Sequence, residues 1–253
     1  MRWALAQDCL LEEEQRAVCL AAARGGRLET MRLLRAASPP YPWNQNTCSE
    51  AAKLGHLELL RWMRSLSPPC PWGYGSCVAA AKTGQLQVLQ WLRAQGCEWH
   101  TAVCTFAAQQ GQVEALRWLR AQSPPCPWEE IATIVAAENA HLEVLRFLRS
   151  QSPPCPWNAV TCHHAISKGH LHVLRWLRTQ SPPCPWNEDE CALAAKNLGA
   201  GPELLVLMGL DEGTVVELFM DELAGLGAGE QDVSEDEQSQ HSENSTLLSE
   251  LGE

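Results

Sequence analysis

The sequence predicts an all-α fold: a helical repeat solenoid of six to seven stacked helix pairs followed by an acidic tail. The chain of 253 residues has 11 Trp against only 3 Phe and 2 Tyr, a bias typical of one short motif copied many times. The copies recur with a period of 29 residues, and apolar residues within each copy follow helical spacing. These observations predict a repeat domain over residues 1–208, a capping helix over 209–226 and a disordered acidic tail over 227–253.

Tryptophan marks the period. Successive markers are separated by 29, 27, 29, 29 and 29 positions, and the short step falls where residues 94–98 replace a junction that contains Ser-Pro-Pro-Cys-Pro. The markers are Trp43, Trp72, Trp99, Trp128, Trp157 and Trp186. Six positions that fit one template indicate a genuine internal repeat.

The unit that begins at Asn158 shows the expected elements. Residues 158–168 fit a first helix with Asn158 as its N-cap, and Gly169 ends that helix at a position suited to left-handed backbone. Residues 170–178 fit a second helix with a broad apolar stripe. The prolines of segment 181–186 stop this helix, since proline lacks a backbone donor and favours extended backbone before it. One such unit cannot bury its apolar face alone, so its neighbours must cover that face.

Asparagine recurs just before the first helix. Asn44 and Asn187 are the counterparts of Asn158, and a side-chain oxygen at this position accepts a hydrogen bond from a free backbone N–H of the first turn. Glu190 follows Asn187 by three residues, so its side chain is expected to reach back and complete a capping box.

The two ends depart from the template. Residues 2–9 resemble residues 90–97, the end of a second helix with its linker, so the chain is expected to begin inside a repeat. That remnant is either an N-terminal cap or the end of an array with further repeats upstream. Residues 191–196 and 202–208 form a degenerate last pair, and residues 210–226 provide the capping helix.

Segments 51–60 and 136–145 resemble the heart of the ankyrin repeat, which reads A-A-x-x-G-H-x-E-V-V. The resemblance covers roughly Cys9 to Met208 and implies antiparallel helix pairs stacked into a curved array with a concave, protein-binding face. No unit carries the ankyrin T-P-L-H, and the period is 29 rather than about 33. The missing residues come from the loop that builds the ankyrin β-hairpin finger. We interpret the chain as a divergent, Trp- and Cys-rich ankyrin-like protein.

Charge is unevenly distributed along the chain. The net charge of the chain is −11, but 14 acidic residues and no Lys or Arg lie from Glu203 onward. The first 202 residues contain the other 16 acidic residues and all 19 basic ones, so their net charge is +3. No signal peptide follows Met1, and no apolar run reaches the roughly 18 residues of a membrane span. We therefore expect reduced thiols in a cytoplasmic protein, with a nuclear location also compatible, and a monomer with no membrane partner.

Ten of the 12 cysteines form two columns, one in the linkers and one in the first helices. A zinc site using these thiols with His163 and His164 is one interpretation, but no C-x2-C knuckle occurs, and packing as small apolar side chains is the interpretation we favour. We expect no metal or cofactor. His56, His141 and His170 are expected to stabilise turns, and no residue set fits a catalytic site, so we expect no enzyme activity.

Arginines form two columns on the second helices. The first contains Arg32, Arg61, Arg117, Arg146 and Arg175, and the second contains Arg35, Arg64, Arg93, Arg120, Arg149 and Arg178. Three interpretations stay open: a solvated helix face with local Glu–Arg pairs, a surface that receives the acidic tail, and a nucleic-acid site. The overall acidity makes nucleic acid the least favoured partner.

Recognition is expected where residues vary between units while the scaffold stays fixed. The candidate partner-binding residues are Tyr74, Thr101, Phe106, Glu130, His163 and His164. The favoured function is a non-catalytic scaffold that binds a protein partner through the concave face, with aromatic side chains as anchors. The alternative is a substrate adaptor that docks through residues 210–226 on an enzyme complex such as a ubiquitin ligase.

Overall fold

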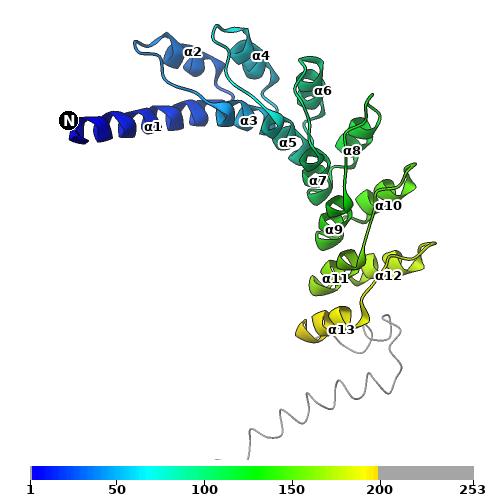
Figure 1. The fold of residues 1–253 in the computed structure, drawn as a ribbon. Coiled ribbons are helices and arrows are strands. Elements are labelled where there is room, and N and C mark those ends of the chain that lie inside the picture. The colour runs from blue at the N-terminus through cyan, green and yellow to red at the C-terminus, as the bar shows by residue number, and fades with distance from the viewer. Residues whose placement is uncertain (1, 199–253) are drawn as a thin grey trace, which may run out of the picture. The chain divides into compact units, whose positions relative to one another are not determined.

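The structure, a computed structural model, describes residues 2–198, with side chains from Leu11 onward, as helices joined by turns and linkers (Figure 1). The helices are α1 (Arg2–Arg24), α2 (Leu28–Ala36), α3 (Gln45–Lys53), α4 (Leu57–Ser65), α5 (Tyr74–Lys82), α6 (Leu86–Ala94), α7 (Thr101–Gln109), α8 (Val113–Arg120), α9 (Glu130–Glu138), α10 (Leu142–Ser150), α11 (Ala159–Ser167), α12 (Leu171–Thr179) and α13 (Glu188–Asn197). No strand occurs in this part of the chain. The predicted all-α repeat solenoid is confirmed.

Each repeat contains a first helix, a tight turn, a second helix and an extended linker that ends in tryptophan. Repeat one comprises α1, α2 and the linker to Trp43, and α13 begins repeat seven. The repeats between them are repeat two (44–72), repeat three (73–99), repeat four (100–128), repeat five (129–157) and repeat six (158–186).

The first helices form a closely packed row. From α1 to α11 each odd-numbered helix contacts the next one, and each second helix packs on the first helix of its own repeat (Figure 1). Small side chains such as Ala51 and Ala52 are fully buried in this row and let neighbouring backbones approach closely. Larger side chains of the second helices, such as Leu60 and Met63, fill the space behind them. Burying each of these larger side chains contributes about 1.5–3 kcal/mol, which ties stability to stacking.

The turn inside each repeat requires left-handed backbone, as predicted for Gly169, which has φ +72°. Glycine occupies the equivalent position in every described turn of this kind except that of repeat five, where Ala140 takes φ +59°. The histidine that follows joins neighbouring repeats: His141 Nε2 lies 3.1 Å from the carbonyl oxygen of Gln109, and His170 Nε2 lies 3.0 Å from that of Glu138. The expected turn-stabilising role of these histidines is therefore confirmed.

Asn44 caps the first helix of repeat two, as predicted, and Thr47 adds a reciprocal hydrogen bond. Asn44 Oδ1 accepts from the N–H of Thr47 at 3.3 Å, and the Thr47 hydroxyl accepts from the N–H of Asn44 at 3.3 Å. Threonine thus completes the capping box. At the start of α13, Asn187 Oδ1 accepts from the backbone N–H of Glu190 at 3.3 Å, which is the helix-capping half of the box expected there.

The N-terminal segment differs from the prediction. Residues 2–9 were expected to end a second helix and enter a linker, but α1 is one continuous helix from Arg2 to Arg24. The physical reason is local: residues 7–10 contain neither the proline of the other linkers nor a glycine like Gly96, which takes φ +76° in the short linker of repeat three. Without such a residue the helix continues.

The predicted last half-repeat at 202–208, the capping helix at 209–226 and the tail at 227–253 lie outside the described residues.

Candidate partner-binding surface

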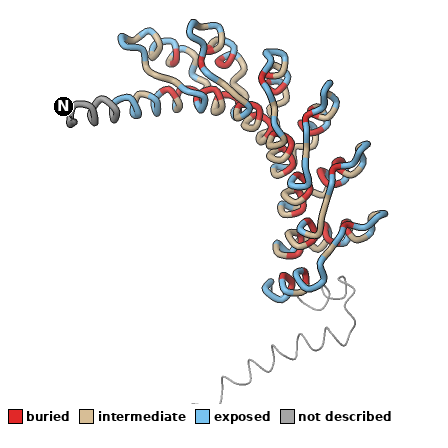
Figure 2. Tube along the Cα trace, viewed as in Figure 1, coloured by how far each residue is buried: buried red, intermediate tan, exposed pale blue. Residues whose placement is uncertain are grey.

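The first helices expose one face, and the helical geometry explains which residues form it. In a nine-residue first helix, positions 1, 2, 5, 6 and 9 fall within one arc, while positions 3, 4, 7 and 8 point to the opposite side. In α5 the second set is Ser76, Cys77, Ala80 and Ala81, all buried. We call the surface made by the first set the first-helix face. Its members are half-buried or exposed in α3, α5, α7, α9 and α11 (Figure 2).

Large apolar side chains are exposed on this face. The exposed fractions are 56% for Tyr74, 48% for Ile131, 39% for Val160 and 60% for Leu193. All four occupy positions of the exposed arc, and the core of the array is filled by other residues. These side chains lie on the first helices of repeats three, five, six and seven, which makes the first-helix face a candidate binding surface.

Two predicted residues meet at the start of α7. The Tyr74 ring centroid lies 5.8 Å from that of His100, the N-cap of α7, and the hydroxyl of Thr101 lies 3.2 Å from His100 Nδ1. Phe106 lies half-buried further along the same helix, with the ammonium of Lys82 5.5 Å from its ring centroid. An aromatic and cationic cluster therefore spans α5 and α7.

The other predicted pair is in repeat six. The rings of His163 and His164 have centroids 5.8 Å apart and meet edge to face. His164 Nδ1 lies 3.7 Å from one carboxylate oxygen of Glu138, and Lys168 Nζ lies 3.6 Å from the other. This cluster joins α11 to α9 through the carboxylate of Glu138.

Glu130 joins neither cluster. It is exposed at the first position of α9, and its carboxylate makes no ion pair with any described residue. Sequence inspection missed Ile131 and Val160, which stand at the second position of α9 and α11. Their place on the helical wheel could have identified them, because the buried Ala-Ala column fixes which arc faces the core.

The second arginine column is structural. In repeat five, Arg149 Cζ lies 3.8 Å from the Trp157 ring centroid, and Arg149 Nη1 donates to the carbonyl oxygen of Cys155 at 2.7 Å. Equivalent stacking recurs in all six repeats at 3.8–4.6 Å: Arg35–Trp43, Arg64–Trp72, Arg93–Trp99, Arg120–Trp128, Arg149–Trp157 and Arg178–Trp186. These guanidinium groups fix the linker against its own second helix.

The first arginine column is mostly neutralised. Four of its members pair with a glutamate three residues earlier at 3.1–3.8 Å: Arg32–Glu29, Arg61–Glu58, Arg117–Glu114 and Arg146–Glu143. The two columns therefore do not form a continuous row of free cations, as a site for a phosphate backbone would need.

The two cysteine columns are buried, and all described cysteines are free thiols. Linker thiols donate to the carbonyl oxygen of the N-cap residue of the preceding first helix, as in Cys155 to Glu129 at 3.3 Å and Cys184 to Asn158 at 3.4 Å. Burial raises the pKa of Cys155 to about 12 and that of Cys191 to about 11. These thiols stay protonated near neutral pH and pack as predicted.

Neither metal chemistry nor a membrane span is indicated in the described part of the chain. No group of three or more His, Cys, Asp or Glu side chains there could hold a metal ion. Among the same residues, no helix is both long and apolar enough to cross a bilayer.

Of the comparisons with known proteins, only the one with solved structures found similar chains. No protein-family model matches the sequence, and no curated protein does. The human ASB11 ankyrin repeat domain is 16% identical with a TM-score of 0.44, over 62% of this chain and 80% of that one. The pentatricopeptide repeat protein PPR10, solved in complex with an 18-nt psaJ RNA element, is 17% identical with a TM-score of 0.46, over 82% of this chain and 35% of that one. The RNA is a ligand of that protein.

The architecture defines the class of protein to which the chain belongs. A first helix, a left-handed turn, an antiparallel second helix and stacking through the first helices are repeated from α1 to α12. The chain is an all-α, ankyrin-like repeat protein whose linkers are fixed by paired arginine and tryptophan.

Proposed function

We propose that the chain is a non-catalytic scaffold that binds a partner protein through its first-helix face. The observation that carries the proposal is the exposure of Tyr74, Ile131 and Val160 on the first helices of repeats three, five and six, whose opposite sides supply the core. Aromatic side chains are enriched among the few residues that supply most of the binding free energy of protein interfaces. Tyr74, Thr101, Phe106, Glu130, His163 and His164 are the proposed contact residues.

The composition of the face suggests how its regions contribute. Tyr74 and Phe106 would anchor apolar groups of the partner, with Lys82 beside Phe106. His163 and His164 would supply polar contacts at the other end of the face, where Glu138 holds the second ring. Protein interfaces usually combine apolar and polar contacts, and this face offers both.

The test is affinity capture with the full-length chain as bait, followed by mass spectrometry. The face variant carries Tyr74→Ala, Phe106→Ala and His163→Ala. The matched control carries three alanines on the second helices, at Arg61, Arg117 and Arg146.

Circular dichroism must first show that both variants keep the helix content of the wild type. Partners that are lost with the face variant and kept with the control would support the proposal. Partners that are kept with the face variant and lost with the control would place recognition on the second helices, and the proposal would be wrong.

A further inference from the structure

Repeat six differs in charge from the repeats before it. Residues 158–186 contain no Asp or Glu, whereas repeat five contains four Glu and two Arg. Repeat six carries Lys168, Arg175 and Arg178, together with four histidines. Arg178 is held in its own repeat, because its guanidinium stacks on Trp186 and donates to the Cys184 carbonyl oxygen at 3.0 Å.

Arg175 lacks the partner that its counterparts have. In repeats one, two, four and five the residue three positions earlier is glutamate, and it pairs with the arginine. In repeat six that residue is His172. Both side chains are exposed, and Arg175 makes no ion pair with another residue of the described chain.

Lys168 precedes these two residues at the turn of the repeat, and its ammonium lies 3.6 Å from a carboxylate oxygen of Glu138. Lys168 is the C-cap of α11, and His172 is the second residue of α12. His170 between them is held in place through Nε2, and its ring centroid lies 6.3 Å from that of His172. We call Lys168, His172 and Arg175 the basic patch.

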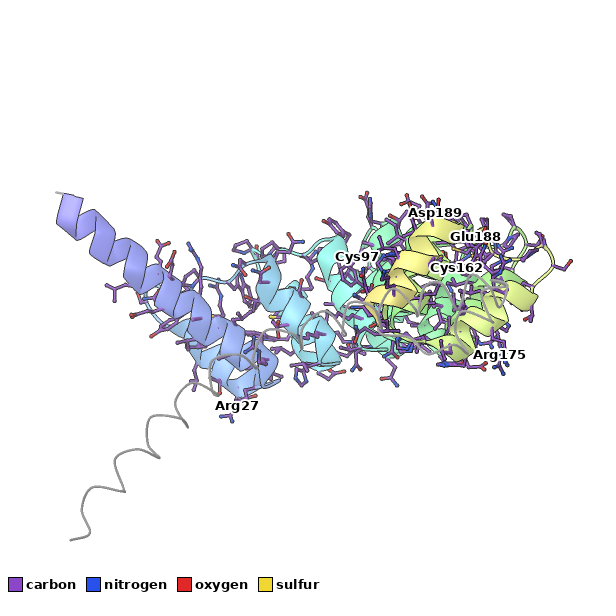
Figure 3. The ribbon with its side chains drawn as sticks, turned by 90° about the horizontal axis from the view of Figure 1, so that it is seen from below. Arg27, Cys97, Cys162, Arg175, Glu188 and Asp189 are labelled. Carbon is purple, nitrogen blue, oxygen red and sulfur yellow. The ribbon has the colours of Figure 1, made fainter. Side chains whose placement is uncertain are left out.

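The acidic start of α13 does not cover this patch. Glu188 and Asp189 belong to the first turn of α13. Figure 3 shows them at one edge of the ribbon and Arg175 at the opposite edge. The patch therefore offers a guanidinium, a partly shared ammonium and an imidazole to solvent.

We propose that the basic patch binds an acidic segment of the partner protein. The inference rests on the proposed function only in taking the partner to be a protein. Charge complementarity selects the occupant: carboxylates would pair with Arg175 and Lys168 and accept a hydrogen bond from His172. A nucleic acid fits less well, because its phosphates need cations on successive repeats, and the equivalent arginine of repeat five is paired with Glu143.

The test uses the full-length chain and a fluorescein-labelled peptide of alternating Glu and Ser, with fluorescence anisotropy as the readout. The decisive variant is His172→Glu, which recreates in repeat six the Glu–Arg pair of four other repeats and so should fold normally. Gln87→Glu adds the same charge at the same position of repeat three and is the matched control. We expect His172→Glu to weaken binding roughly tenfold and Gln87→Glu to change it less than about twofold.

Three further results would overturn the proposal. One is equal affinity for a Gln and Ser peptide. Another is tighter binding of a single-stranded oligonucleotide of similar length, which would make the patch a nucleic-acid site. The third is a several-fold gain in affinity when Glu235, Asp236 and Glu237 are replaced by their amides, which would make the chain's own acidic segment the occupant.

The peptide assay also separates this inference from the proposed function. The face variant with Tyr74→Ala, Phe106→Ala and His163→Ala leaves the basic patch intact, so it should bind the acidic peptide like the wild type. Loss of captured partners with that variant would bear on the first-helix face alone.

Discussion

Arg149 is predicted to stabilise the fold, whereas Arg146, one turn earlier on α10, is not. Arg149 donates to the Cys155 carbonyl oxygen at 2.7 Å and stacks 3.8 Å from the Trp157 centroid. A hydrogen bond to a charged group contributes about 1.5–3 kcal/mol, and a cation–π contact adds about 0.5–1 kcal/mol. Arg149→Met keeps much of the apolar stem, so we expect it to lower the free energy of unfolding by about 2–4 kcal/mol.

Arg146→Met is the matched control, because it removes only an exposed ion pair with Glu143 at 3.3 Å. Exposed pairs of this kind contribute about 0.3–0.5 kcal/mol. Thermal and urea unfolding followed by circular dichroism would measure both variants. Equal losses of stability would refute the assignment of a structural role to the second arginine column, and that column would again be a candidate binding surface.

Three other predictions concern turns, thiols and caps. Ala140→Gly should raise the melting temperature, since it removes about 1–2 kcal/mol of left-handed backbone strain and costs about 0.5–1 kcal/mol of chain entropy. Gly111→Ala should lower the melting temperature, because the new Cβ would lie 2.9 Å from a ring nitrogen of His141. Unchanged melting temperatures of both variants would contradict this. The pKa of the Cys155 thiol is raised from 9.0 to about 12, so its stabilising effect is complete below pH 9 and is lost as the pH rises toward 12. Chemical unfolding at pH 9 and 10 should differ by about 1 kcal/mol for this thiol, and Cys155→Ala should reduce the slope. Asn44→Ala should cost about 1 kcal/mol in urea unfolding, and no loss would mean that the Asn44 cap does not stabilise α3.

The repeat architecture could be predicted because each unit carries its own stop and start residues. Proline in the linkers, glycine in the turns and asparagine before the first helices recur at fixed spacing, so local backbone preferences agree with the stacking of the whole array. The prediction for the N-terminus was wrong for the same reason. Residues 2–9 resemble a linker in composition but lack the proline or glycine that ends a helix, and α1 runs through them.

The contacts of the surface arginines were harder to predict from the sequence. Both arginine columns have the same residue type and helical spacing, and only the fold shows that Arg149 reaches Trp157 across the linker while Arg146 reaches Glu143 on the same helix. The eight-residue Arg-to-Trp spacing recurs in most units and could have indicated the stacking. The sequence shows His172 where other repeats have glutamate. Its consequence for Arg175 could be inferred only once the structure showed that the Glu–Arg ion pairs of those repeats form.

The most direct test of the central claim is hydroxyl-radical footprinting of the full-length chain, alone and in complex with a partner identified by capture. Tyr74, Phe106 and His163 report on the first-helix face, and Trp62 and Trp91, half-buried on second helices outside repeat six, report on the other side. We predict strong protection of the first three side chains and unchanged labelling of both tryptophans. Protection of Trp62 and Trp91 with unchanged labelling of Tyr74, Phe106 and His163 would contradict the account.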